Sequence, residues 1–504
     1  MQMKSKWSCL AVACLATLLL SLDMTVLHLA LPRLVGDLGA NATQLLWIGD
    51  MYGFALAGLL ITMGNLGDRI GRKRLLLIGA AAFGAASVLT AYAPSPELLI
   101  AARALLGVAA ATIMPSTLSI IRNVFTDPGE RTAAVGIWSG MSAVGFAVGP
   151  VIGGLLLDHF WWGSVFLINV PIMALVLVAG RLVLPESRNP DAGRIDLPSV
   201  VLSFIGIVTA IYAIKEAAHQ GFEHAGVPVA AVLGIACLGL FVRRQTGLAQ
   251  PLIDMRLFGN RAFSASIGTN MLAIFAMTAM SLILAWYFQL VLGWTPLQAG
   301  LATLPGGLGG AVGGILAARL IGPLGRNGVV ALGLAMTAGS FLYYSALGLD
   351  TSFLALLAPQ LIGGIGVGFT LTVNNDNVLA TAPRARAGAA AAVSETAFEL
   401  GGALGIAILG TVLNSSYSAG LRLPAGVPGE AARESIAGAL RTAETLPPAL
   451  AGQVIEAARV AFVGAVHITA LSTSAILAVV AALALVGLRG VPKVIPEERL
   501  TPVH

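Results

Sequence analysis

The fold is decided by the stretch Gly64-Asn-Leu-Gly-Asp-Arg-Ile-Gly-Arg-Lys-Arg74, which lies between two long apolar segments. Residues 44–63 precede it and residues 75–93 follow it, and each is long enough to cross a hydrocarbon layer of about 30 Å as a helix. Basic residues in a short loop beside such helices are typical of the cytoplasmic side of a membrane. The stretch therefore predicts two membrane helices joined by a cytoplasmic loop.

The same pattern continues along all 504 residues. Hydrophobic residues make up 57% of the chain and charged residues 11%, whereas a soluble domain averages about 25% charged residues. We therefore predict an all-α integral membrane protein with fourteen spanning helices. Their approximate ranges are 8–32, 44–63, 75–93, 97–121, 132–157, 163–184, 196–216, 227–242, 262–290, 297–321, 329–349, 353–380, 388–413 and 461–488.

The distribution of positive charge sets the expected orientation. Most of the 29 lysine and arginine residues fall in segments that lie inside if the N-terminus is inside. Apart from the loop at 414–460, the external side has only Arg33 and Lys215. Because basic residues near membrane helices stay cytoplasmic, we expect a multi-pass protein of the bacterial cytoplasmic membrane with both termini inside. Basic residues spread over many short loops do not form the concentrated face that nucleic acid needs.

A weak internal repeat predicts how the helices are grouped. The loop Ala318-Arg-Leu-Ile-Gly-Pro-Leu-Gly-Arg326 is similar to Gly64–Arg74 but lacks its aspartate. Duplicated halves with a site between them are the usual plan of secondary transporters, so we expect two six-helix bundles and an extra central pair of helices. The expected units are an N-terminal bundle at 1–195, helices 7 and 8 at 196–242, and a C-terminal bundle at 243–504 with an external hairpin loop at 414–460.

The loop Gly64–Arg74 also carries a candidate gate. Asp68 and Arg72 are four residues apart and share a face if the segment is helical. Gly64 and Gly71 allow close approach of backbones. Such a pair could hold the cytoplasmic ends of two helices together and break when they part; alternatively, the arginines only set the topology.

The fifth helix carries a stripe of small residues. Gly145, Gly149 and Gly153 recur every four residues, and Pro150 lies among them. Small residues at this spacing favour tight helix packing in membranes, and the proline predicts a kink. From physics alone the stripe is a packing surface.

Five acidic residues fall inside the predicted helices, where ionisable groups are costly and usually functional. They are Asp23, Asp50, Asp376, Glu395 and Glu399. Glu395 and Glu399 share a helix face, and two close carboxylates away from water suit the exchange of a proton for a cation. We expect these two and Asp23 to couple proton movement to substrate movement. Asp50 and Asp376 are further candidates, which could instead be solvated or cap a helix.

Aromatic rings and one buried arginine complete the candidate site. Organic cations can bind ring faces, and the candidates are Tyr52, Trp138, Trp286 and Phe398. Arg103 lies within a predicted helix, where it could anchor a network of helices or take part in proton movement.

The sequence contains no sign of an enzyme. It lacks a nucleotide-binding loop, a nucleophile paired with a base, and a cluster of metal ligands. Its three cysteines lie in apolar runs and form no disulfide framework. We therefore expect no cofactor and no metal, and a proton gradient as the energy source.

Together these segments resemble the major facilitator superfamily. Gly64–Arg74 matches its loop 2–3 signature, Arg103-Ala-Leu-Leu-Gly107 its helix 4 signature, and Gly140–Gly154 the helix 5 pattern of its antiporters. Leu22–Pro32 and Ser394–Gly405 are similar to segments of its fourteen-helix drug:proton antiporters. The resemblance implies alternating access and assigns Arg103 and Gly107 to the helix 4 motif.

The resemblance also implies a cargo. The carboxylates of helices 1 and 13 are most similar to those of exporters of quaternary ammonium compounds, cationic dyes and related biocides. We expect such drugs as the cargo and a monomer in the lipid bilayer. Helix 10 lacks the extra acid of some relatives, so recognition of dications is in doubt. An exporter or importer of a natural metabolite, or a channel or membrane sensor, stays open as an alternative.

Overall fold

The computed structural model describes residues 3–40, 42–189, 195–220, 226–425 and 427–493. No strand occurs in these ranges, and the chain is almost entirely helical. The elements are α1 (Met3–Leu38), α2 (Ala42–Ile70), α3 (Arg72–Ala91), α4 (Pro96–Val124), α5 (Pro128–His159), α6 (Ser164–Leu167), α7 (Asn169–Val183), α8 (Leu197–Gln220), α9 (Gly226–Gly247), η1 (Met255–Gly259), α10 (Arg261–Trp286), η2 (Tyr287–Val291), α11 (Pro296–Tyr344), α12 (Phe353–Thr381), η3 (Arg384–Arg386), α13 (Ala387–Gly420), α14 (Glu430–Glu434), α15 (Ile436–Glu444) and α16 (Pro448–Gly487).

The prediction of fourteen membrane helices is confirmed. The described residues contain 13 helices long and apolar enough to span a membrane. One of them, α11, is 49 residues long and contains Gly325 at a φ of 72°, where the helix is interrupted. This positive φ is accessible to glycine at little cost, so α11 consists of two successive spans, and the total is fourteen.

Local sequence signals set where the helices begin. Ser95 caps α4 by accepting a hydrogen bond from the Leu98 amide, and Asp127 caps α5 in the same way through Glu130. Thr295 and Gln298 form a capping box at the start of α11. Each of these helices also has proline in its first turn, where the missing N–H costs no hydrogen bond.

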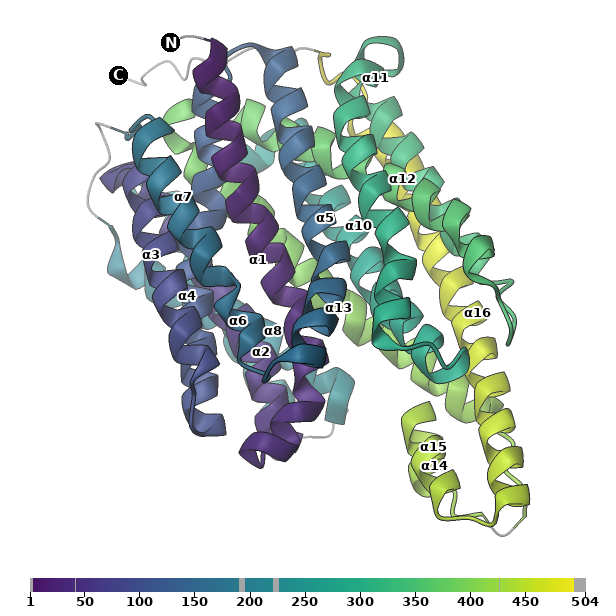
Figure 1. Ribbon diagram of the computed structural model, residues 1–504. Helices are drawn as coiled ribbons and strands as arrows, with labels where there is room; N and C mark the ends of the chain where they lie inside the picture. Colours follow the sequence, from purple (N-terminus) through teal and green to yellow (C-terminus); the bar gives the residue numbers. More distant parts are fainter. Residues whose placement is uncertain (1–2, 41, 190–194, 221–225, 426, 494–504) are drawn as a thin grey trace.

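The helices form one long bundle whose two ends differ (Figure 1). α1 begins and α16 ends at the upper end of this view, and the short helices α14 and α15 lie beside α16 at the lower end. Lys6 of α1 pairs with Glu130 of α5 at 2.9 Å, which places the start of α5 at the upper end as well. The upper end of the bundle is thus the end at which α1 and α5 begin, and the lower end is the one that carries α14 and α15.

Buried apolar side chains form three clusters. The first is drawn mainly from α1–α7, the N-terminal half, and the second mainly from α10–α16, the C-terminal half. A third joins α8 and α9 to α2, α10, α12 and α13, with Phe54, Ile207 and Ile211 among its members. The observed fold is thus two six-helix bundles with an additional helix pair packed against both. The residue boundaries predicted for these units stay a prediction.

The loop expected at 414–460 is shorter in the structure. α13 continues to Gly420 and α16 begins at Pro448. Residues 448–460 form the first part of α16, where Val454 and Ala458 are buried. α14 lies against α13, where the Tyr417 hydroxyl donates to the Ala432 carbonyl at 3.0 Å.

Outward-facing apolar side chains agree with a lipid environment. Leu182, Ile235 and Leu354 are 80%, 74% and 75% exposed in the isolated chain. A water-soluble protein rarely exposes large apolar areas, whereas hydrocarbon chains cover such side chains in a membrane.

The small-residue stripe of α5 packs against two different helices. A Cβ on Gly145 would collide with the Leu18 carbonyl and Ser21 of α1, and one on Gly149 with Thr25. Nearer the upper end, Gly136 lies against the backbone of Gly314 in α11. The stripe therefore brings α5 close to α1 of the N-terminal half, and Gly136 brings it close to α11 of the C-terminal half, as close packing through glycine allows.

We expect Gly145→Leu to destabilise the protein by about 1–3 kcal/mol, the cost of overpacking a tight interface. The leucine side chain has no space between α5 and the Leu18 carbonyl. Thermal unfolding of the purified protein in detergent measures the change. Gly154→Leu is the matched control on the same helix, because a Cβ there meets no atom within 4 Å. Equal losses of stability in the two variants would contradict the packing role.

Candidate functional site

Asp23 lies in a buried polar cluster within the N-terminal half. Its side chain is 1% exposed and pairs with Arg103 Nη1 of α4 at 3.1 Å. Its second oxygen accepts from Asn169 Nδ2 of α7 at 2.7 Å, and Asn169 also donates to Ser87 of α3. Asp23 is thus neutralised by a cation and held from two further helices.

Arg103 ties this cluster to α2. It donates to the Ile48 carbonyl at 3.3 Å, and its guanidinium lies 4.7 Å from the centre of the Tyr52 ring. Tyr52 is buried, yet its hydroxyl has no hydrogen-bond partner among the described residues. The Tyr52 ring therefore packs on the Asp23–Arg103 pair while its hydroxyl stays unbonded.

Glu395 and Glu399 lie one turn apart on α13. Glu395 is buried and Glu399 is half-buried. Within the described parts of the chain, neither carboxylate accepts a hydrogen bond or contacts a cation within ion-pair distance. These two are therefore the acids inside the bundle whose charge the protein leaves open.

A belt of amides lies beside them toward the upper end. Asn270 of α10 donates to Asn375 of α12 at 2.9 Å, and Ser394, next to Glu395, donates to the same oxygen at 3.0 Å. Asn374 donates to Thr269 of α10 at 2.8 Å. The belt links α10, α12 and α13, and it was not singled out from the sequence, because isolated amides in apolar runs carry no pattern.

Asp376 is completely buried between two arginines. It contacts Arg131 of α5 at 2.7 Å and Arg326 of α11 at 2.8 Å, and Thr132 donates to it at 2.8 Å. The suggestion that Asp376 is solvated is therefore wrong. The carboxylate joins the two halves and supplies the acid that the loop Ala318–Arg326 lacks.

Asp50 lies in the lower part of α2 and is one-third exposed. It forms an ion pair with Lys215 of α8. The sequence placed Lys215 merely on the external side; the structure places it against an intramembrane acid, because α8 packs beside α2.

The candidate gate residues lie together at the upper end. Asp68 accepts from Arg72 Nη2 at 2.6 Å and from the backbone amides of Gly388 and Ala389 at 3.1 and 3.2 Å. Arg72 in turn donates to the Arg384 carbonyl at 2.7 Å. Asp68 thus caps the first turn of α13, in the other half, where unpaired N–H groups favour an anion.

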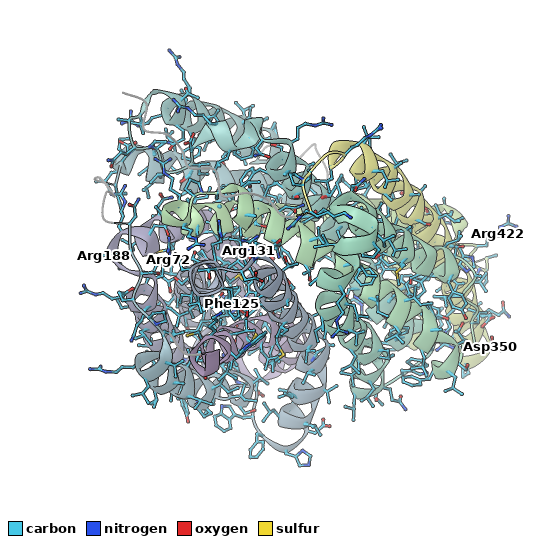
Figure 2. All side chains as sticks on the ribbon, turned by 90° about the horizontal axis from the view of Figure 1, so that it is seen from above. Arg72, Phe125, Arg131, Arg188, Asp350 and Arg422 are labelled. Atoms are coloured by element: carbon cyan, nitrogen blue, oxygen red, sulfur yellow. The ribbon has the colours of Figure 1, made fainter. Side chains whose placement is uncertain are left out.

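The glycines of this loop are required by close contacts. A Cβ on Gly64 would collide with the Gly388 carbonyl, and a Cβ on Gly388 would collide with the Gly64 carbonyl. Gly71 has a φ of 113°, and Glu186 lies against it while accepting from the amides of Lys73 and Arg74. In Figure 2, which looks at the bundle from above, Arg72 and Arg131 lie inside the outline, whereas Arg188, Arg422 and Asp350 lie at its edge.

The helix 4 and helix 5 motif residues serve helix packing. Gly107 lies against the backbone of α2 at Tyr52, and Pro150 lies against Gly300 of α11. Gly153 is buried. The motif residues therefore bring α4 close to α2, and α5 close to α1 and α11.

The four aromatic candidates do not form one cage. Trp138 is buried and donates to Thr117 at 3.2 Å within the N-terminal half. Trp286 is 42% exposed on α10, and Phe398 is half-buried next to Glu399. Two of the four lie near the acids. Tyr52 packs on Arg103, the partner of Asp23, and Phe398 precedes Glu399 in the sequence.

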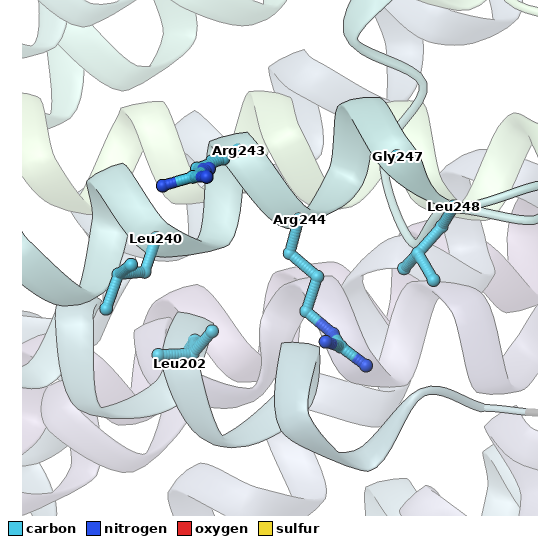
Figure 3. A pocket seen from close by; sticks show the side chains of 6 residues that line it. All are labelled: Leu202, Leu240, Arg243, Arg244, Gly247 and Leu248. Carbon is cyan, nitrogen blue, oxygen red and sulfur yellow. The ribbon is translucent and has the colours of Figure 1, made fainter.

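A groove of about 430 Å³ lies apart from these acids (Figure 3). It runs between α8 and α9 and is lined by Leu202 of α8 and by Leu240, Arg243 and Arg244 of α9. Arg244 donates to Asp196 at 2.6 and 2.8 Å, and these bonds together with those from Ser199 hold the pKa of Asp196 well below its usual range. The groove is on the outer surface and is not the site of the buried acids.

Other kinds of site find no support in the described ranges. No group of three or more His, Cys, Asp or Glu residues there could hold a metal ion. The three cysteines are free and buried. Among the described residues, the side chains gathered around the intramembrane acids are arginines, amides, hydroxyls and Lys215.

Comparison with known proteins gives consistent matches. Residues 13–406 match the family model of the Major Facilitator Superfamily. The multidrug efflux pump LfrA of Mycolicibacterium smegmatis is 44% identical over 484 residues, which cover 95% of each chain. The methyl viologen resistance protein SmvA of Salmonella typhimurium is 38% identical over 482 residues, which cover 93% of this chain and 95% of SmvA. The human organic anion transporter MFSD10 shares the fold, with a TM-score of 0.63 at 14% identity, covering 95% of this chain and 99% of MFSD10.

We expect Asp376→Asn to destabilise the protein by about 3–5 kcal/mol, because it leaves two buried arginines without their shared carboxylate. Thermal unfolding in detergent measures the loss. Glu395→Gln is the matched control, since Glu395 is buried but has no cation to leave unpaired. If Asp376→Asn were as stable as the wild type, the ion pairs with Arg131 and Arg326 would not hold the two halves together.

We expect Asp68→Asn to open the upper end more often, because the neutral amide binds Arg72 and the amides of α13 less strongly. A cysteine replacing Ala392, which is fully buried where α13 meets Gly64, reports the opening. Loss of one charged hydrogen bond predicts that a maleimide labels this cysteine roughly tenfold faster.

The labelling is measured after the native cysteines have been replaced. Asp158→Asn, a change at an exposed acid near the lower end of α5, should leave the rate unchanged. Equal rates in the two aspartate variants would show that Asp68 does not hold the upper end closed.

Proposed function

The chain belongs to the major facilitator superfamily, and we propose that it is a proton-coupled antiporter that exports lipophilic organic cations such as quaternary ammonium compounds and cationic dyes. The observation that carries this proposal is the pair Glu395 and Glu399 on α13. These carboxylates lie inside the bundle without a cation, while the aspartates of the same region are paired. An acid in this state can take either a proton or an organic cation.

The proposed cycle uses competition for these carboxylates. When Glu395 and Glu399 are ionised, a cation from the cytoplasm or inner leaflet is attracted to them, and the Phe398 ring can add a cation–π contact. Protons that arrive from outside neutralise the acids and weaken the hold on the cation. Because both ligands need the same carboxylates, uptake of protons drives release of the cargo.

Asp23 has a different part in this proposal. It is already neutralised by Arg103, so protonation of Asp23 would release Arg103 and change how α1, α2 and α4 are joined. The Tyr52 ring lies against Arg103, with its centre 4.7 Å from the guanidinium. Asp23 would then couple proton binding to movement of the N-terminal half rather than bind the cargo.

The two ion-pair groups at the upper end are the proposed inner gate. Asp68 and Arg72 hold α2 against α13, and Asp376 holds α5 against α11 and α12. The excess of basic residues in the loops at this end favours a cytoplasmic position for it. We infer both termini inside, the bacterial cytoplasmic membrane as the location, and a monomer in the lipid bilayer as the working unit.

The relatives support an efflux role. LfrA is named a multidrug efflux pump, and SmvA is named for resistance to methyl viologen. Both align along nearly the entire length of this chain. We extend drug efflux to this protein on that basis, and the preference for cations on the basis of the open carboxylates.

Efflux of ethidium from vesicles tests the proposal. We expect a pH gradient to drive uphill export by the wild type, and an ionophore that collapses the gradient to stop it. Glu399→Gln removes the charge that proton and cation share, and Asp23→Asn removes the charge that holds Arg103, so both variants should lose gradient-driven export.

Asp158→Asn provides the control, because Asp158 is exposed and distant from the buried acids. It should transport ethidium like the wild type. Unchanged efflux in the Glu399 and Asp23 variants would sink the assignment, and transport unaffected by the ionophore would indicate a channel instead of an antiporter.

A further inference from the structure

The extra helix pair contributes a cation to the candidate site. Lys215 extends from α8 to Asp50 of α2, with which it forms an ion pair, and its ammonium lies 5.3 Å from the centre of the Phe54 ring. α8 also packs against α13, the helix that carries Glu399. A residue from outside the two six-helix bundles is therefore paired with an acid of the N-terminal one.

The surroundings of this ammonium resemble a binding site for an organic cation. Trp47 stacks on Tyr212 of α8 with ring centres 6.4 Å apart and planes 18° apart, and it lies 6.1 Å from Phe54. Carboxylates and aromatic faces are the groups that bind an ammonium ligand. In this structure Asp50 and the Phe54 ring hold the ammonium of Lys215.

The packing of α8 shows that this lysine is held in place. Ile207 and Ile211 are buried against α2 and α13, in the cluster that contains Phe54 and Ala403. Phe204 and Val208 of α8 pack directly against Gly58 of α2, where a Cβ would collide with both side chains. α8 is therefore seated tightly against α2, and Lys215 sits one turn beyond Ile211.

We propose that Lys215 is a tethered cation that occupies the Asp50 subsite and thereby makes the transporter favour substrates with one positive charge over substrates with two. The proposal rests on the proposed function, cation export, and names a determinant of its substrate class. A monocation is matched by the acids of α13, which lie one turn apart, whereas a second positive charge farther along the cargo would have to compete with Lys215 for Asp50.

Charge accounting supports this assignment. Asp23 is neutralised by Arg103, and Asp376 by two arginines. Asp50 differs from both, because its counter-ion is the partly exposed Lys215 and not a buried arginine. Replacing Lys215 with a neutral residue makes the region more negative by one unit and exposes Asp50 to the cargo.

The test compares a dication with a monocation. Methyl viologen and ethidium are bound to the purified protein in lipid nanodiscs, and the ratio of their dissociation constants is taken for each variant. We expect Lys215→Gln to shift the ratio toward methyl viologen by about three- to fivefold, the scale of a partly exposed ion pair. Lys215→Arg keeps the positive charge and should keep the wild-type ratio.

A double variant shows whether the shift acts through Asp50. Asp50→Asn combined with Lys215→Gln removes both charges and should return the ratio to that of the wild type. If the shift persisted in the double variant, or if Lys215→Gln left the ratio unchanged, the proposal would be overturned. The exchanged pair, Asp50→Lys with Lys215→Asp, restores the ion pair and should restore the ratio, which separates lost charge from lost folding.

Failure of the proposed function has a different signature. If the wild type neither bound ethidium nor exported it along a pH gradient, cation export itself would be wrong. If the wild type did both and only the ratio failed to respond to Lys215, the role of Lys215 alone would be rejected.

Discussion

The structure depends on one constraint, which is that a charge inside a membrane protein must be paired or neutralised. A buried charge without a partner is strongly unfavourable in a medium that solvates ions poorly. Asp23 meets this constraint through Arg103, and Asp376 through two arginines. Glu395 and Glu399 have no such partner among the described residues, and under the proposed function a proton or an organic cation neutralises them.

Close backbone contacts supply the mechanical counterpart of these ion pairs. Gly136 meets Gly314, and Gly64 meets Gly388, so helices of opposite halves touch through backbone near the upper end. Small residues give membrane helices large contact area at little conformational cost. Under the proposed function, the ion pairs beside these contacts break when a proton or the cargo changes the charge of a carboxylate. Helices that touch through glycine can then separate without unpacking large side chains.

Much of this could be predicted from the sequence, because length and hydropathy are local properties. The fourteen spans, including the division of α11 near Gly325, follow from apolar runs and loop charges. Asp68 and Arg72 were recognisable as a pair since their spacing is short. The predicted loop at 414–460 is too long, since α16 already begins at Pro448. The start of this helix is amphipathic, and hydropathy alone does not mark where such a helix begins.

The sequence by itself determined the membrane-spanning class, the number of helices and the identity of the intramembrane acids. Only the tertiary structure decided which of those acids have partners. Arg131, Arg326 and Lys215 each lie more than 40 positions from the acid they contact, so no local pattern links them. Partnership depends on which helices become neighbours, and that is settled by packing over the complete bundle, where α8 can bring a lysine to α2.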